Sequence, residues 1–416
     1  MSKLQDLIDS LCPNGVEFKP LGEVCNKICS GGTPLTSNKS YYNGSIPWLR
    51  TQEVDWQDVY DTEIKISEEA VKNSSAKLIP ANCVIVAMYG ATAAKVCINR
   101  IPLTTNQACC NLEINCSMAY YKYVYYWLCN SYEKLKAMGE GSQNNINSQK
   151  IKNFLIPIPP LAVQEEIVRI LDRFSNYAAE LQAELQARKE QYEYYRNLLL
   201  TFNPSACGCG TDDKQKDSVI APPSTTYKIQ WKKMGEIGYL VTSRVNANDI
   251  QNYVGVENLL KDRAGCVPSA ELPIGDSHIG FDINDILIGN IRPYLKKIWL
   301  ADRNGGTNGD VLTIRLTDPK LSPKLLYHIL ASDTFFLYHN QYAKGAKMPR
   351  GDKNMVMNYL IPIPPLEVQE KIVAILDRFE TLVNDLSKGL PAEIEAQKTR
   401  YEYYRNKLLT FKPLPA

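Results

Sequence analysis

Polar loops in both halves of this 416-residue chain combine Asn, Gln, Arg, Lys and Tyr side chains with Gly-containing turns. Arginine and lysine pair with guanine edges, asparagine and glutamine pair with adenine edges, and lysine or threonine contacts phosphates. The predicted chemistry is therefore hydrogen bonding to DNA. The candidate DNA-binding residues are Arg50, Tyr89, Thr92, Lys95, Asn106, Gln107, Gln143, Asn144, Asn145, Asn290, Arg292, Tyr294, Lys296, Asn308, Lys347, Arg350 and Lys353. Most surface loops are polar, so each residue taken singly is more readily explained as structural.

The loops follow one order in both halves, although their sequences differ. The matched landmarks are 88–92 with 289–294, Lys95 with Lys296, 105–107 with 307–309, and 141–147 with 345–352. Short apolar runs such as 83–88 and 311–314 predict strands between these loops. Helices are expected around 120–136 and 323–338.

The loops are followed by a segment that occurs twice. Ile156–Phe174 and Ile361–Phe379 agree at sixteen of nineteen positions, and Tyr192–Phe202 and Tyr401–Phe411 agree at ten of eleven. A repeat period of about 200 residues indicates two tandem domains rather than a solenoid. Each copy opens Ile-Pro-Ile-Pro-Pro, which favours an extended segment before the helical pattern begins.

Apolar residues in each copy follow alternating steps of three and four, which predicts two long helices of coiled-coil type. From Leu161 to Phe202 the first helix would be roughly 60 Å long at about 1.5 Å per residue. The alternative is a long helix that packs on its own domain. The residues predicted for the coiled coil are Leu171, Phe174, Leu181, Leu185, Tyr192, Tyr195, Leu199, Leu376, Phe379, Leu386, Tyr401, Tyr404 and Leu408.

The two helices differ by four residues, because the offset between copies changes from 205 to 209. Such an insertion locally unwinds a supercoil, and Gly389 and Pro391 predict a kink or break there. The first helix contains a tandem Ala-Glu-Leu-Gln at 179–186. Adding or removing one copy would change the helix length by about 6 Å and rotate the rest of the helix by about 40°.

The composition predicts a globular, two-domain α+β protein in the cytoplasm, with no apolar run of membrane-spanning length. Two similar halves favour a pseudo-twofold axis and antiparallel pairing of the long helices. The predicted parts are a first domain 1–155, its helix 156–203, a linker 204–226, a second domain 227–360, and its helix 361–416. The net charge is only +2, so DNA affinity would need a more basic partner.

No catalytic constellation emerges from the sequence. It lacks a Gly-x-x-x-x-Gly-Lys-Ser/Thr phosphate loop and an Asn/Asp-Pro-Pro-Tyr/Phe methyltransferase motif. Twelve cysteines without zinc spacing indicate free thiols and no metal site, with Cys207 and Cys209 as the pair that would be tested first.

Several motifs together resemble the specificity subunit of type I restriction–modification enzymes. They recur in order over the whole chain: Gly31–Pro34, Ile46–Arg50, Met88–Thr92, Thr105–Ala108, Asn290–Ile298, Ala346–Asp352 and both repeated segments. The resemblance implies two target-recognition domains that each read half of a bipartite double-stranded DNA sequence. It also implies an antiparallel coiled coil that spaces them.

The partners implied by the resemblance are two methyltransferase subunits and two restriction/translocase subunits. Each repeated segment, with the coiled-coil residues named above, would also dock one methyltransferase subunit. S-adenosylmethionine, ATP and Mg²⁺ would belong to those partners, and this chain would bind no cofactor and catalyse no reaction. Two alternatives remain open: the specificity subunit of a complex that only methylates, and a coiled-coil scaffold that binds only proteins.

Overall fold

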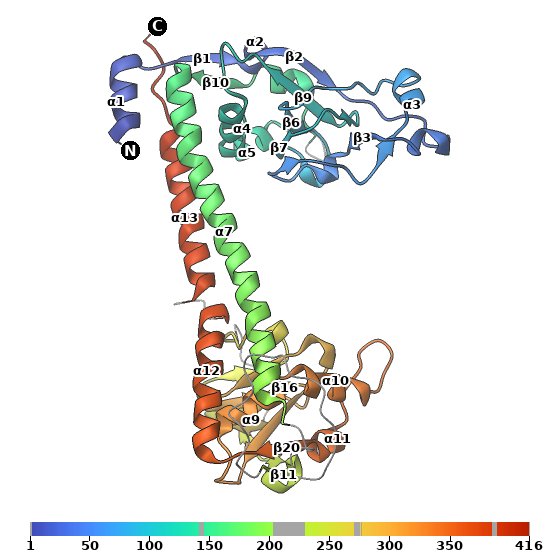
Figure 1. Cartoon of the computed structure of the whole chain (residues 1–416), viewed down its shortest axis with the longest axis vertical. Helices are drawn as coiled ribbons and strands as arrows, with labels where there is room; N and C mark the ends of the chain where they lie inside the picture. Colours follow the sequence, from blue (N-terminus) through green and yellow to red (C-terminus); the bar gives the residue numbers. More distant parts are fainter. Residues whose placement is uncertain are drawn as a thin grey trace, which may run out of the picture. The chain divides into compact units, whose positions relative to one another are not determined.

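The computed structural model describes residues 2–140, 145–202, 229–269, 275, 277–384 and 389–415 (Figure 1). They form two compact units, Met1–Ala179 with Ala396–Ala416, and Glu180–Glu395. Each unit combines sheets with helices, which confirms the predicted mixed architecture and the two domains. The predicted linker 204–226, Cys207, Cys209, Gln143, Asn144 and Leu386 lie outside the described residues.

Unit 1 is built on a five-stranded sheet in the order β2-β9-β6-β7-β4, with a three-stranded sheet β5-β3-β8 and a pair β1-β10. Its elements are α1 Ser2–Leu11, β1 Glu17–Pro20, α2 Leu21–Val24, β2 Cys25–Ser30, β3 Ile46–Leu49, β4 Asp58–Val59, β5 Lys65–Ile66, α3 Glu68–Lys72, β6 Val84–Ala87, β7 Val96–Asn99, β8 Thr104–Thr105, β9 Cys109–Ile114, α4 Tyr121–Asn130, α5 Tyr132–Ala137, α6 Ser148–Lys152, β10 Leu155–Ile158 and the first part of α7 Leu161–Leu200. Helix α4 packs on β6 and β7. The short helices η1 Lys39–Tyr42, η2 Thr51–Glu53 and η3 Gly90–Thr92 lie in its loops.

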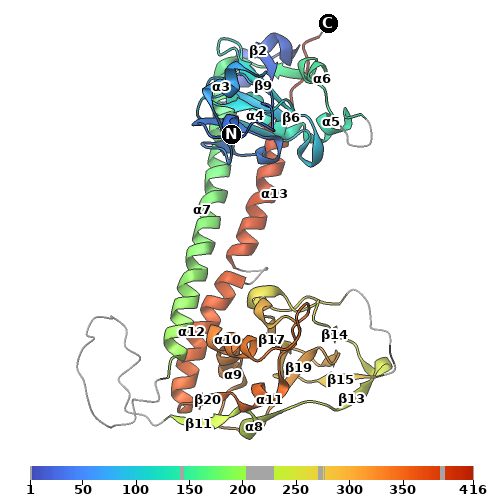
Figure 2. The same ribbon diagram turned by 90° about the vertical axis from the view of Figure 1, so that its right-hand side faces the viewer.

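Unit 2 has a four-stranded sheet β12-β19-β16-β17, a second sheet β13-β15-β18-β14 and a pair β11-β20 (Figure 2). Its elements are β11 Gln230–Lys233, α8 Met234–Ile237, β12 Gly238–Leu240, β13 Arg244–Asn246, η5 Ala247–Asp249, β14 Tyr253–Val254, η6 Lys261–Arg263, β15 Ser277–Phe281, β16 Ile286–Gly289, η7 Pro293–Leu295, β17 Ile298–Leu300, β18 Gly305–Thr307, β19 Val311–Leu316, α9 Pro323–Leu330, α10 Asp333–Gln341, α11 Lys353–Asn358, β20 Leu360–Ile363, α12 Leu366–Asn384 and α13 Leu390–Leu408, whose last part belongs to unit 1.

The repeated Ile-Pro-Ile segments form equivalent strands. Strand β10 pairs antiparallel with β1, and β20 pairs antiparallel with β11. The prolines after each strand end the pairing and begin the helices α7 and α12. The boundaries drawn from the sequence at 155/156 and 360/361 cut through these two strands.

The long helices pair within each unit, where the two partners run antiparallel (Figures 1 and 2). In unit 1 the ring of Phe174 stacks on Tyr404 at 5.3 Å between centroids. In unit 2 the rings of Tyr192 and Tyr195 stack on Phe379 at 6.1 and 5.5 Å. The division predicted near Gly389 is present, since α12 ends at Asn384 and α13 begins at Leu390.

The alternative of a helix packed on its own domain also holds, for the first turns of each helix. Leu171 belongs to the same core as Tyr123 in unit 1, and Leu376 belongs to the same core as Leu326 in unit 2. The other described seam residues are buried or half-buried: Phe174, Leu181, Leu185, Tyr192, Tyr195, Leu199, Phe379, Tyr401, Tyr404 and Leu408. None of the described helices has both the length and the apolar character needed to cross a membrane.

His339 of α10 should make the stability of unit 2 depend on pH. Its side chain is 1% exposed and stacks on the Phe335 ring. Burial lowers the pKa of His339 to about 4 from its ordinary 6.5. Between these values the unfolded chain binds the proton and the folded unit does not, so stability should fall as pH drops from about 6.5 to about 4. The full loss is about 3 kcal/mol. Urea unfolding at several pH values should show a flatter profile for His339→Leu; an unchanged slope would contradict this assignment.

Candidate nucleic-acid interface

The predicted loops of unit 1 meet where strand β6 ends and strand β9 begins. We call residues 88–95, 105–108, 140 and 145–146 loop cluster 1. The Met88 N–H donates to the carbonyl of Ala108, and the Ile146 N–H donates to the carbonyl of Met88, both at 2.8 Å. Glu140 and Asn145 exchange two backbone hydrogen bonds. Strand β6 therefore ends in a loop that two other segments hold on both sides.

Unit 2 repeats this backbone arrangement with other residues. Loop cluster 2 comprises residues 289–297, 307–311 and 344–351. The Asn290 N–H donates to the carbonyl of Asp310 at 2.8 Å, and the Gly351 N–H donates to the carbonyl of Asn290 at 3.0 Å. Lys344 and Arg350 exchange two bonds of 2.9 Å. The two clusters thus share one backbone scaffold and present different side chains.

The loops that follow strands β6 and β16 have the same backbone shape in the two clusters. Gly90 and Ala94 take left-handed φ angles of 79° and 69°, and Arg292 and Lys296 take 53° and 50°. Left-handed backbone costs a residue with a side chain roughly 1–2 kcal/mol. Such strain is concentrated at functional sites, where the surrounding structure enforces it. Arg292 therefore occupies a place that a glycine fills in the other half.

Four side chains in the clusters carry buried polar atoms with no partner among the described residues. They are the amide oxygens of Asn106, Asn145 and Asn290, and the Nε atom of Arg292. A buried polar atom without a hydrogen bond is unfavourable by about 1–3 kcal/mol and calls for an explanation. Asparagine and arginine are also the residue types that pair with adenine and guanine.

Several predicted cations already hold carboxylates. Arg350 contacts Asp310 at 3.1 Å, and Lys95 contacts Asp55 at 2.6 Å. The guanidinium of Arg50 binds Glu53 and Glu63. Arg350 is 58% exposed, so a phosphate or base could replace its carboxylate at small cost.

The remaining predicted residues occupy varied positions. Tyr89 and Tyr294 are exposed, and the hydroxyl of Thr92 donates to the carbonyl of Thr51. The hydroxyl of Thr33 donates to Gln107, and Asn308 accepts from the Asp310 N–H at 3.0 Å. Lys347 and Lys353 are exposed. These positions leave the assignment of each residue to DNA a prediction.

One pairing of landmarks needs correction. The ammonium of Lys296 lies on Asp333 of α10, 2.6 Å away, rather than among the polar loops. The carbonyl of Lys297 accepts from the Gly289 N–H, as the carbonyl of Lys95 does from Ala87. Lys297 is therefore the structural counterpart of Lys95. A shift of one residue within a short loop does not change the order of the landmarks along the chain, so the order alone could not reveal it.

Two residues of loop cluster 2 were not singled out from the sequence. Asp310 binds Arg350, and Lys344 pairs with Arg350 through the backbone. Gly345 and Pro349 lie between the paired positions and are typical of a tight connection. That signal predicts a hairpin, but it does not predict which loop the hairpin contacts.

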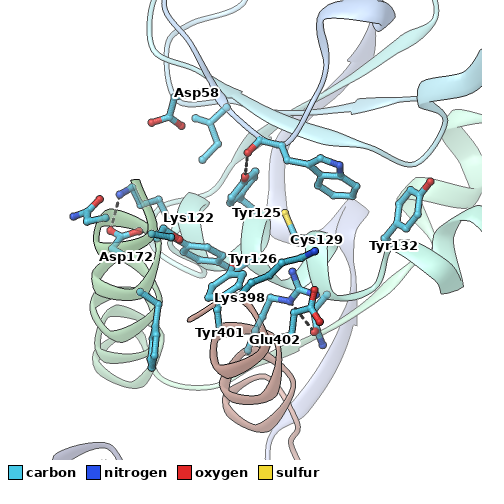
Figure 3. A pocket seen from close by; sticks show the side chains of 18 of the residues that line it. Asp58, Lys122, Tyr125, Tyr126, Cys129, Tyr132, Asp172, Lys398, Tyr401 and Glu402 are labelled. Atoms are coloured by element: carbon cyan, nitrogen blue, oxygen red, sulfur yellow. Dashed lines mark hydrogen bonds and ion pairs between the residues drawn. The ribbon is translucent and has the colours of Figure 1, made fainter. Parts of the chain in front are cut away.

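A cavity of about 850 Å³ lies elsewhere in unit 1, between α4, α7 and α13 (Figure 3). Its charged lining residues are Arg100, Lys122, Lys398, Arg405, Asp58, Glu133, Asp172 and Glu402. Basic and acidic groups are equal in number, and Arg100 and Lys122 pair with Asp58 and Asp172. The cavity therefore has no surplus positive charge for a phosphate backbone, which leaves the loop clusters as the candidate interface.

Among the described residues, one group of possible metal ligands comes together: His328, Asp377 and Glu380, within 4.8 Å of one another. Lys324 binds Asp377, and the hydroxyl of Tyr327 donates to Glu380. These donors already satisfy the two carboxylates, so the group does not favour a cation. The prediction that the chain binds no metal stays a prediction.

Sequence comparison decides the family. The sequence model of the type I restriction modification DNA specificity domain matches residues 13–191 and 278–396, more than half of the chain. The chain belongs to this family. Loop cluster 1 lies inside the first range that matches the specificity family, and loop cluster 2 lies inside the second.

Several members of the specificity family are similar to this chain over most of its length. The specificity subunit of the type I restriction enzyme EcoR124I/EcoR124II from Escherichia coli is 30% identical over 298 residues, 70% of each protein. The putative type I restriction enzyme specificity subunit S.HindORF215P from Haemophilus influenzae is 28% identical and covers 95% of this chain and 96% of its own length. The crystal structure of the type I restriction-modification S subunit from M. genitalium shares the fold, with a TM-score of 0.55 at 12% identity over 95% of this chain and 96% of that one.

Proposed function

We propose that this chain is the DNA-recognition subunit of a type I restriction–modification complex, in which each loop cluster reads one half of a split target. The observation that carries the proposal is the duplicated cluster in a member of the DNA specificity family. One backbone scaffold presents Asn106 and Asn145 in unit 1, and Asn290 and Arg292 in unit 2. Different side chains on the same scaffold suit two different base sequences.

The mechanism is recognition without catalysis by this chain. Asn and Arg side chains would pair with base edges, while exposed Lys347 and Lys353 would contact phosphates. A net charge of +2 supplies little of the phosphate neutralisation that gives tight DNA binding. Most of the affinity would therefore come from partner subunits that close around the same DNA.

The proposed partners are two methyltransferase subunits and, in the complete complex, two restriction/translocase subunits. S-adenosylmethionine, ATP and Mg²⁺ would be bound by those subunits, in the cytoplasm. One further solved structure shares the fold, with a TM-score of 0.58 at 17% identity over 95% of this chain and 98% of that one. Its title concerns complex assembly and conformational transition of the type I R-M system.

The deciding experiment is methylome sequencing of cells with and without the gene, together with its methyltransferase partner. The expected result is a split motif that carries methyladenine in each half and disappears with the gene. Absence of any gene-dependent motif would favour a scaffold that binds only proteins. Methylation without cleavage of unmodified DNA would identify a complex that only methylates.

Arg292→Gly should separate recognition from folding. Glycine relieves the left-handed backbone but loosens the unfolded chain, so the free energy of unfolding should change by less than about 1 kcal/mol. Loss of a guanidinium that pairs with a base should weaken discrimination by about 1–3 kcal/mol, at one half-site only. Methylation of targets with single-base changes measures this effect.

Asn145→Ala is the matched variant, and it should affect the other half-site. Equal weakening on every DNA sequence by Arg292→Gly would mean that Arg292 contacts phosphate instead. Arg350→Ala should behave like Arg292→Gly, since Arg350 lies in the same cluster.

A further inference from the structure

The first turn of α7 holds the first domain through a buried glutamine. Gln164 is fully buried, and its Oε1 atom accepts from the Tyr120 N–H at 2.8 Å. Its Nε2 atom donates to the carbonyls of Met118 at 3.2 Å and Pro159 at 2.7 Å. One side chain thus joins the start of α4, the end of the β10 segment and the helix.

A second contact lies two helical turns later. Asp172 accepts from the ammonium of Lys122 and from the hydroxyl of Tyr126, both at 2.6 Å (Figure 3). Gln164 and Asp172 are eight positions apart. They therefore lie on one face of α7 about 12 Å apart. Together they fix α4 at two points along α7.

Unit 2 has the same two contacts. Gln369 accepts from the Ser322 N–H at 2.8 Å and donates to the carbonyls of Lys320 and Pro364, both at 2.7 Å. Eight positions later, Asp377 binds Lys324 of α9, and His328 takes the place of Tyr126 at 3.0 Å. Gln369 is 1% exposed. We call each Gln and Asp pair, with its partners, a clasp.

Each clasp is connected to a loop cluster through a shared hydrophobic core. Tyr123 and Val124 of α4 lie in one core with Val86 of β6 and Val96 of β7. The loop between β6 and β7 is the central loop of cluster 1. In unit 2, Leu326 of α9 shares a core with Ile288 and Ile298, which flank the central loop of cluster 2.

We propose that the two clasps are positioning elements that set the direction of each loop cluster on its helix, and thereby the gap between the two halves of the target. The inference rests on the proposed function. The first turns of α7 and α12 also pack into the cores of their units, but apolar contacts are non-directional, so they oppose rotation of the domain about its helix less than directed hydrogen bonds do. Contacts at two points about 12 Å apart remove that rotation. Each half has a glutamine and an aspartate at equivalent positions of its repeated segment, although the domains that they hold differ in sequence.

The test uses the full chain, expressed with its methyltransferase partner, and a plasmid library that holds both half-sites at the native gap and at gaps changed by one or two base pairs. The double variant Gln164→Ala with Asp172→Asn should raise methylation at the changed gaps at least about tenfold relative to the native gap. Preference for the bases within each half-site should stay unchanged. Gln369→Ala with Asp377→Asn should give the same result through the other half.

Leu171→Ala is the control for general destabilisation, because Leu171 is buried beside the clasp but makes none of its hydrogen bonds. If Leu171→Ala relaxes the gap as much as the double variant, or if the double variant keeps the native gap, the proposal is overturned. Asp172→Asn alone replaces one carboxylate oxygen by an amide and should raise methylation at the changed gaps by a smaller factor. This single variant tests the proposal if the double variant does not accumulate. Failure of the wild-type chain to direct methylation to any split motif would instead reject the proposed function.

Discussion

Deletion of Ala179–Gln182 is expected to shorten the gap in the recognised sequence by one or two base pairs. The next four residues repeat the deleted ones, so the chemistry at the junction is unchanged and only the length differs. Helix α7 is continuous through this segment, and the division between the two units falls inside it, after Ala179. Removing four residues shortens the helix by about 6 Å and turns its remaining residues by about 40°.

The measurement is the methylated motif of cells that carry the deletion. Methylation of the parent sequence should fall more than about tenfold, while both half-site words persist at the shorter gap. Glu180→Ala with Gln182→Ala is the matched control, since both side chains are exposed and the length is kept. An unchanged gap in the deletion variant would show that α7 does not set the spacing.

Leu376→Ala should strongly destabilise unit 2. The side chain is 0% exposed and lies in the core that joins α12 to the domain. Truncation of a buried leucine removes apolar contacts and leaves a cavity, which is typically unfavourable by about 2–5 kcal/mol. The neighbouring Ile375 is 42% exposed, so Ile375→Ala should change stability by less than about 1 kcal/mol.

Urea unfolding followed by hydrogen exchange of peptides from each unit measures this difference. Protection of β16 and β19 should fall in Leu376→Ala, while β6 and β9 should keep theirs. Equal effects of Leu376→Ala and Ile375→Ala would mean that α12 does not contribute to the core of unit 2 as described.

The helices and the duplicated order of loops could be predicted from sequence because their signals are local. The prolines of Ile-Pro-Ile-Pro-Pro forbid helix, and the apolar steps after them favour it. The four-residue difference between copies correctly located the division between α12 and α13. These features depend on neighbours in the chain, so one sequence is enough to find them.

The clasps and the ion pairs could not be found this way. Gln164 and its counterpart Gln369 both stand in a Val-Gln-Glu segment of the repeat, but nothing in the pattern distinguishes a buried glutamine from an exposed one. The partners of Gln164 include backbone groups of Met118 and Tyr120, more than forty residues earlier. Likewise, the pairing of Arg350 with Asp310 depends on how two distant loops meet.

The composition of unit 1 bears on how the protein is made. Its core contains Leu408 and Leu409, and the Val16 N–H donates to the carbonyl of Lys412. Unit 2 is complete once Glu395 has left the ribosome. Domains usually fold in the order of synthesis. Unit 1 begins first but needs residues from the end of α13, so its apolar core stays incomplete in the nascent chain until Leu408 and Leu409 have been made. Premature termination between Glu395 and Leu408 should therefore yield a complete second unit and an incomplete first unit, which proteolysis would remove.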